Sequence, residues 1–129
     1  MKSPHRNFAS IHPDHRGKLG VVDLRVLPFT PTRTFWVTAV DESVVRANHA
    51  HRECSQFLIC AQGRVRFEIR RPDGAQQEEW LAAGDALHLE PHTWLKLWGF
   101  SRESLVMVFC DLPYDLGDYI TDFEEFSRL

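Results

Sequence analysis

The chain has 129 residues, of which 43% are apolar, and a formal net charge of −3 at pH 7. This length predicts one domain, residues 1–129, with a buried core, and the mixed, weakly acidic charge excludes a typical surface for nucleic acid or anionic membranes. Three cysteines without CxxC spacing, no apolar leader and no apolar run of the ~18 residues that a membrane span needs predict a reduced, cytoplasmic protein.

Short apolar runs alternate with turns along most of the chain. Val65, Phe67 and Ile69 alternate with charged residues, which predicts a strand with one buried face. Pro72-Asp73-Gly74 and Gly84-Asp85 are strong turn sequences. The strands predicted in this way are residues 19–24, 34–40, 47–51, 55–61, 64–70, 76–81, 86–90, 94–98 and 104–110. Many short strands with a turn about every ten residues indicate an all-β sandwich or barrel.

The C-terminal tail has a different periodicity. Tyr119, Ile120, Phe123 and Phe126 recur at helical spacing after Asp118, a residue type that often begins a helix. The tail is therefore expected to form a short helix, with Asp118 as its N-cap, packed on the outside of the strands.

His49 and His51 are the strongest candidates for chemistry. Side chains two positions apart on a strand point to the same face, so both imidazoles enter one space. Imidazole titrates near pH 6.5, which suits general acid–base catalysis. The alternative is that both are core polar residues whose hydrogen bonds are satisfied within the fold.

The surroundings of the pair resemble the two motifs of cupins. Gln56 and Gly63 follow the HxH in the order of the first motif, and Gly84-Asp85 with Pro91 resembles the second. The resemblance implies a small cupin barrel, an RmlC-like jelly roll. Gln56 and Leu95 occupy the positions where metal-binding cupins place further ligands, and an amide and an aliphatic side chain ligate poorly. We expect no metal and no other cofactor.

Nearly the whole chain is similar to the WxcM-like sugar 3,4-ketoisomerases. The residues that carry this resemblance are Arg16-Gly17-Lys18-Leu19, Pro28-Phe29, Arg33, Arg46-Ala47-Asn48-His49-Ala50-His51, Gln56-Phe57-Leu58-Ile59-Cys60, Tyr114-Asp115, Asp118-Tyr119-Ile120 and Phe126. The resemblance implies isomerisation of dTDP-4-keto-6-deoxyglucose, a dTDP-linked keto sugar, to its 3-keto isomer, through proton transfer from carbon 3 to carbon 4.

The resemblance also implies roles for single residues. His51 would be the base at carbon 3, and His49 would serve the oxygen protons. The substrate would be held by Arg33 and Arg46, whose guanidinium groups suit the diphosphate, by Gln56 and by Trp36, which could stack on the sugar or base. A homodimer is implied as well, with the strands around residues 19–24 exchanged between subunits.

The chain departs from the family pattern in three ways. Phe35 and Trp36 stand where a tyrosine is common, so no phenol is expected in the site from this strand. Leu95 replaces a histidine, and Ala47 replaces a glycine. These departures leave two alternatives open: a related nucleotide-sugar epimerase or variant isomerase, and a non-catalytic ligand-binding cupin.

Overall fold

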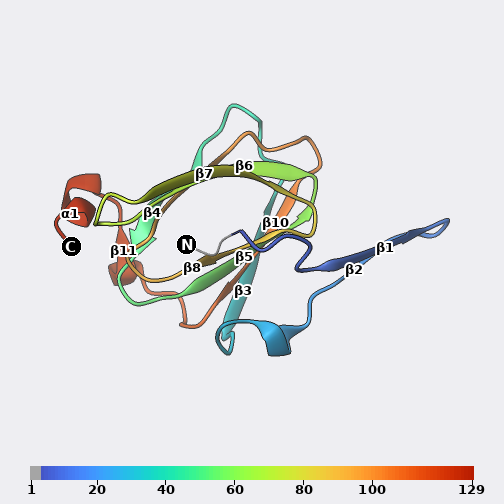
Figure 1. The fold of residues 1–129 in the computed structure, drawn as a ribbon, viewed down its shortest axis with the longest axis horizontal. Helices are drawn as coiled ribbons and strands as arrows, with labels where there is room; N and C mark the ends of the chain where they lie inside the picture. Colours follow the sequence, from blue (N-terminus) through green and yellow to red (C-terminus); the bar gives the residue numbers. More distant parts are fainter. Residues whose placement is uncertain (1–3) are drawn as a thin grey trace.

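The computed structural model describes residues 4–129, and its regular secondary structure is almost entirely antiparallel strands (Figure 1). The elements, in chain order, are β1 (Ser10–Asp14), β2 (Gly17–Val21), η1 (Leu24–Val26), β3 (Arg33–Thr38), β4 (Arg46–His51), β5 (Gln56–Gln62), β6 (Arg64–Arg70), β7 (Gln76–Ala82), β8 (Ala86–Leu89), β9 (Trp94–Trp98), β10 (Leu105–Cys110), η2 (Leu116–Asp118), β11 (Tyr119–Ile120) and α1 (Phe123–Ser127).

Two sheets face each other and form the barrel. One has the strand order β3-β10-β5-β8, and the other has the order β11-β4-β9-β6-β7. In Figure 1, β6 and β7 lie across the barrel from β5 and β8, and α1 lies at the end where β11 pairs with β4. This confirms the predicted all-β barrel with a short C-terminal helix. Among the described residues, no helix is long and apolar enough to cross a membrane.

The N-terminal strand prediction was wrong in its boundaries. The second strand runs over Gly17–Val21 and ends before residue 24, where the 3-10 helix η1 begins with Asp23 as its N-cap. The preceding stretch, Ser10–Asp14, is also a strand and pairs with β2 as a hairpin. This hairpin projects away from the barrel (Figure 1), so most of its side chains are exposed and the usual pattern of one buried face is lost.

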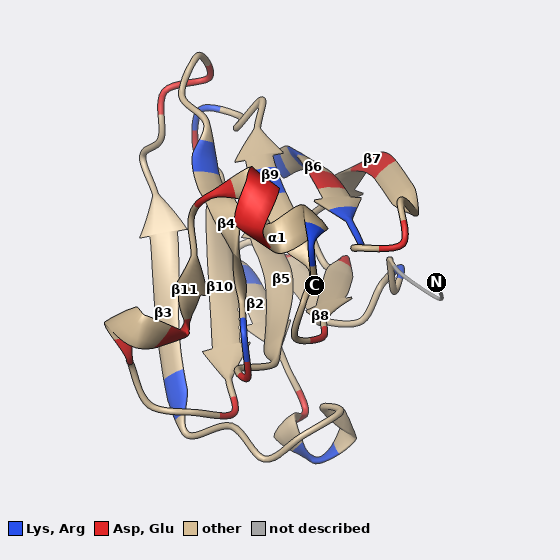
Figure 2. Ribbon diagram, turned by 90° about the vertical axis from the view of Figure 1, so that its left-hand side faces the viewer, with Lys and Arg blue, Asp and Glu red and all other residues tan. Residues whose placement is uncertain are grey.

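The C-terminal helix begins later than predicted. Its N-cap is Asp122, whose carboxylate accepts a hydrogen bond from the Glu124 N–H at 3.0 Å. Tyr119 and Ile120 are instead a short strand, β11, opposite His51 and Ala50 of β4. In the view of Figure 2, β11 lies between β3 and β4, with the acidic α1 nearby. Asp118 therefore caps no helix there, and its carboxylate is free to bind elsewhere.

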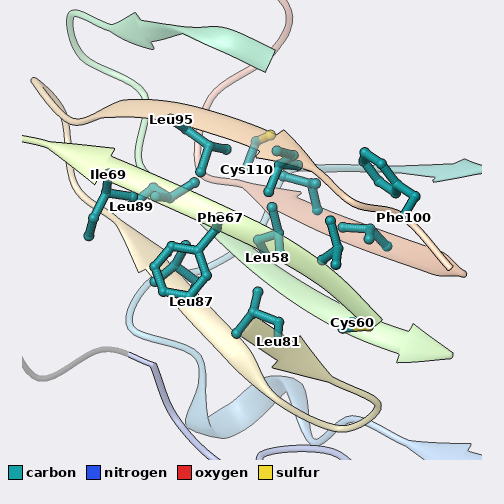
Figure 3. Close-up of a cluster of buried hydrophobic side chains, with 14 of the residues drawn as sticks. Leu58, Cys60, Phe67, Ile69, Leu81, Leu87, Leu89, Leu95, Phe100 and Cys110 are labelled. Atoms are coloured by element: carbon teal, nitrogen blue, oxygen red, sulfur yellow. The ribbon is translucent and has the colours of Figure 1, made fainter. Parts of the chain in front are cut away.

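The barrel interior is filled by apolar side chains from both sheets. Leu58, Phe67, Leu87 and their neighbours point toward one another between the strands (Figure 3). A smaller cluster of Ala50, Trp94, Ile120 and Phe126 attaches α1 and β11 to the outer side of β4. The second cluster matters for function because it fixes the C-terminal segment against the strand that carries both histidines.

Candidate functional site

His51 is held by a buried carboxylate. Its Nδ1 lies 2.9 Å from Oδ2 of Asp118, and the His51 residue is only 7% exposed. The Asp118 carboxylate also accepts the backbone N–H groups of Glu53 at 2.7 Å and of Cys54 at 3.3 Å. Three donors thus fix one carboxylate, which in turn fixes the imidazole. Sequence analysis missed Asp118 as a site residue because helical spacing favoured a capping role.

This pair sets the protonation state of His51. Burial acts to raise the pKa of Asp118, but the hydrogen bonds from Glu53, His51 and Cys54 outweigh it and lower the pKa. An ionised carboxylate only accepts, so Nδ1 of His51 carries the hydrogen and Nε2 keeps its lone pair. Burial lowers the pKa of His51, with Asp118 opposing the shift and Arg33 adding to it. At neutral pH, His51 is therefore a neutral imidazole whose Nε2 is available as a base.

A β-bulge aims His49 into the same space. Ala47 and Asn48 adopt left-handed backbone conformations with φ of 64° and 63°, and the β4–β9 register shifts between Ala47 and His49. The ring centroids of His49 and His51 are 5.2 Å apart. Burial and the neighbouring His51 lower the pKa of His49 to about 4, although a hydrogen bond to the Ala47 backbone opposes the shift. Both imidazoles are thus neutral at pH 7.

Tyr119 brings a phenol to the two histidines. Its ring centroid lies 4.4 Å from that of His51 and 4.9 Å from that of His49. The lack of a tyrosine in β3 therefore does not leave the site without a phenol, because Tyr119 comes from β11. The useful signal was present in the Asp118-Tyr119-Ile120 stretch, but its apolar spacing was read as a helix.

Arg33 places a positive charge beside the two histidines and Tyr119. Its guanidinium donates to Sγ of Cys110 at 3.5 Å and lies over the rings of Phe35 and Tyr114 at 5.5 and 5.6 Å. Over residues 4–129 it forms no ion pair with a carboxylate, and its buried Nε has no hydrogen-bond partner. A partly buried guanidinium without a counterion is suited to an anionic ligand.

Gln56 joins the histidines, whereas two other predicted residues do not. Gln56 lines a cavity with His49 and His51, of about 10 Å³, which is room for roughly one water, and its amide donates to Sγ of Cys110 at 3.4 Å. Trp36 is 63% exposed on the face of β3 opposite to Arg33 and Phe35. Arg46 is exposed at the start of β4 and does not line this cavity.

One group of potential metal ligands overlaps the site. Ligand atoms of His51, Cys54 and Asp118 all lie within 4.8 Å of one another. Metal binding requires a thiolate, but burial raises the pKa of Cys54 to about 12, with further contributions from Cys110 and Asp111 and an opposing hydrogen bond to the Leu112 backbone. Asp118 already accepts three hydrogen bonds. These donors fit a carboxylate–imidazole pair better than a metal centre.

Comparison with known proteins agrees with this geometry. A TDP-4-oxo-6-deoxy-alpha-D-glucose-3,4-oxoisomerase from Aneurinibacillus thermoaerophilus is 27% identical over 123 residues, which cover 95% of this chain and 88% of that protein. A double mutant of the QdtA 3,4-ketoisomerase from Thermoanaerobacterium thermosaccharolyticum, solved with TDP, superposes with a TM-score of 0.83 at 25% identity, covering 96% and 89% of the two chains.

Proteins of lower sequence identity share the fold alone. The rmlC epimerase of Mycobacterium tuberculosis has a TM-score of 0.70 at 14% identity, over 90% of this chain and 66% of that one, which confirms the RmlC-like barrel. The family model described as "FdtA: WxcM-like, C-terminal" matches residues 2–129. The barrel, the paired histidines and this match over nearly all residues place the chain in the FdtA family of WxcM-like C-terminal domains.

Proposed function

We propose that this protein is a TDP-sugar 3,4-ketoisomerase that converts TDP-4-keto-6-deoxyglucose to its 3-keto isomer. The observation that carries the proposal is the His51–Asp118 pair, which leaves a buried, unpartnered Nε2 lone pair inside the barrel. An enzyme that moves a proton between adjacent carbons needs such a neutral base near the substrate. The 27%-identical relative is named for the same reaction.

The reaction follows from the placement of the two imidazoles. Nε2 of His51 removes the proton from carbon 3, the C–H electrons form the carbon 3–carbon 4 double bond, and the π electrons of the carbon 4 ketone move to its oxygen, which takes up a proton. The same nitrogen then returns the carbon-bound proton to carbon 4. His49, also neutral, accepts the hydroxyl proton at carbon 3 as that oxygen becomes the ketone. Both steps use only side chains of the barrel interior, and no metal is required in this scheme.

Arg33 is the group that we assign to the diphosphate. Its guanidinium lies beside the histidines without a carboxylate partner in the described part of the chain, and its planar donors suit phosphate oxygens. Gln56 lies deeper, in the small cavity with the histidines, where it can orient the sugar or an imidazole. Arg46 and Trp36 stay predictions: in one chain both are exposed outside that cavity, so their contacts with substrate would also lie outside it.

We also propose that two copies assemble through the N-terminal hairpin and that the enzyme acts in the reducing cytoplasm. Leu19 and Val21 are 63% and 44% exposed on a hairpin that has no barrel behind it. Exposed strands with apolar side chains are commonly covered by a partner. Light scattering should give twice the mass of one chain. The double variant Leu19→Ser, Val21→Ser should be monomeric. The control Val45→Ser, on the β3–β4 loop, should remain dimeric. A wild type that is monomeric at micromolar concentration would contradict the proposal.

The catalytic proposal is tested with the nucleotide sugar itself. Wild-type protein should isomerise TDP-4-keto-6-deoxyglucose and, in heavy water, should place deuterium on carbon 4 of the product. His51→Asn keeps size and polarity but removes the base, so turnover should fall by about 10²–10⁴-fold while TDP affinity changes little. His5→Asn, outside the barrel, is the matched control and should retain turnover. A wild type that binds TDP but never isomerises the sugar would disprove the proposal.

A further inference from the structure

Both imidazoles face the substrate as hydrogen-bond acceptors, so the histidines alone cannot complete the reaction. Nδ1–H of His51 is committed to Asp118, and His49 is hydrogen-bonded to the Ala47 backbone. A neutral imidazole has one donor and one acceptor, and a carboxylate or a carbonyl takes the donor. Both rings therefore present a lone pair to the substrate. The site has two bases but, from the histidines, no proton donor.

A donor is needed at the oxygen on carbon 4. When the proton leaves carbon 3, the π electrons of the carbon 4 ketone move onto its oxygen, where negative charge develops. Hydrogen-bond donors aimed at such an oxygen are commonly the largest source of transition-state stabilisation. The enediol forms only if this oxygen receives a proton or a strong hydrogen bond.

We propose that the hydroxyl of Tyr119 is this proton donor, a role that rests on the ketoisomerase function proposed above. Its ring is in contact with both imidazoles, at 4.4 Å from His51 and 4.9 Å from His49. Tyr119 lies opposite His51 in the β11–β4 ladder, so the backbone fixes the two side chains relative to each other. The phenol also lies close enough to the Arg33 guanidinium for the two to interact, and a neighbouring cation stabilises a phenolate.

Two other donors near the histidines are less suited to this step. The Gln56 amide donates to Sγ of Cys110 at 3.4 Å, and Arg33 donates to the same sulfur at 3.5 Å. Arg33 also stays charged at all working pH values, so it can hold an anion but cannot deliver a proton. Tyr119 can deliver a proton and later recover one, because a phenol is an acid and its phenolate is a base.

The proton transfers balance with Tyr119 included. The C–H bond at carbon 3 breaks, its proton goes to Nε2 of His51, the electron pair forms the carbon–carbon double bond, and the carbon 4 oxygen takes the Tyr119 proton. His49 then accepts the carbon 3 hydroxyl proton, the new ketone forms, and protonated His51 delivers its proton to carbon 4. Protonated His49 finally returns a proton to the Tyr119 phenolate. One proton has moved between carbons and one between oxygens.

Tyr119→Phe tests the hydroxyl while keeping the ring that packs on both imidazoles. We expect kcat for TDP-4-keto-6-deoxyglucose to fall by about 10²-fold, the scale of lost general acid catalysis, with KM and TDP affinity within about threefold of wild type. Thr38→Val is the control, since it also removes a hydroxyl with a defined hydrogen bond, to the Ser104 carbonyl at 2.9 Å, at the end of β3 away from Arg33. It should keep wild-type kcat.

A second measurement covers the case in which Tyr119→Phe folds poorly. The chain has two tyrosines, so 3-fluorotyrosine can be incorporated in a Tyr114→Phe background, which labels position 119 alone. Fluorine acidifies the phenol with little change in shape, so the pH dependence of kcat should move to lower pH, and a packing role predicts no movement. If Tyr119→Phe keeps full kcat, or if the pH profile of the fluorotyrosine enzyme does not move, Tyr119 is not the proton donor, although an active wild type still supports the ketoisomerase function. An inactive wild type overturns both proposals.

Discussion

At the scale of single residues, the site depends on a contact between distant parts of the sequence. His49 and His51 could be predicted because strand alternation puts side chains two positions apart on one face. Asp118 could not, because it is 67 positions from His51 and its local pattern suits a helix cap equally well. Tyr119 was missed for the same reason. Local sequence records which residue types are present, whereas the pairing of β11 with β4 decides which of them meet.

The role of Asp118 can be tested by a change of one atom. In Asp118→Asn, the amide oxygen in the Oδ1 position can still accept from the Glu53 N–H, but the NH₂ in the Oδ2 position then faces Nδ1 of His51 and the Cys54 N–H. This reverses the tautomer and places the hydrogen on Nε2, so the lone pair is lost. We expect turnover to fall by about 10²–10⁴-fold with TDP affinity retained. Steady-state kinetics and a TDP-induced thermal shift measure the two effects.

The control for this change is Asp122→Asn. Asparagine caps helices as well as aspartate does, so α1 should keep its N-cap bond to Glu124 and the enzyme should keep its activity. If Asp118→Asn were as active as Asp122→Asn, the carboxylate would be structural only and the tautomer argument would be wrong.

At the scale of elements, β4 is the part of the fold that shapes the site. Its predicted span, residues 47–51, agrees with Arg46–His51, but strand alternation alone gives no sign of the bulge at Ala47 and Asn48. The bulge is visible only as positive φ at two residues that are not glycine. The side chain of Asn48 offsets part of this cost, since its Oδ1 accepts from Nε1 of Trp94 at 3.2 Å. Ala47 has no such hydrogen bond, because its side chain is a methyl group, which packs partly buried against the core.

Ala47→Gly should therefore stabilise the protein. The left-handed conformation of Ala47, with φ of 64°, costs an L-residue roughly 1–2 kcal/mol, and glycine avoids this cost at an entropic loss of about 0.5–1 kcal/mol. A net gain of about 0.5–1 kcal/mol in the free energy of unfolding is expected, measured by urea denaturation. Ala50→Gly, on the same strand but buried at ordinary φ against Trp94, Ile120 and Phe126, should instead destabilise. If Ala47→Gly and Ala50→Gly changed the free energy of unfolding equally, the backbone of Ala47 would not be strained.

At the scale of the whole molecule, composition and turn spacing predicted an all-β sandwich or barrel, and the resemblance to the cupin motifs selected the barrel. The eight strands from β3 to β10 all overlap the strands predicted from short runs and turns, although β4 and β7 carry few apolar residues. The order of strands within each sheet is not legible, because β10 pairs with β3 and β5 through contacts that span most of the chain. The N-terminal hairpin was misplaced because an element that projects from the barrel lacks the buried face on which strand prediction depends.

The stability of the whole barrel should depend on pH through its buried histidines. Folding lowers the pKa of His49 to about 4, mainly through burial, and lowers those of His51 and His88 as well, again mainly through burial. Between pH 6.5 and about 4 the unfolded chain therefore binds more protons than the native one. The stabilisation is complete above pH 6.5 and is lost as the pH falls toward 4, by an amount on the order of 2 kcal/mol.

His49→Asn separates this effect from ordinary acid denaturation. Asp118 is not responsible in this range, because the native state lowers its pKa below the usual 3.8, so it is protonated only in more acidic solution. Urea midpoints of the wild type should decline from pH 7.5 to pH 5.0, and the decline should be clearly smaller in His49→Asn. His5→Asn, whose ring lies outside the barrel against Phe8 and Phe57, should show the wild-type decline. A wild-type midpoint that is constant over this interval would mean that His49 is not buried as a neutral base.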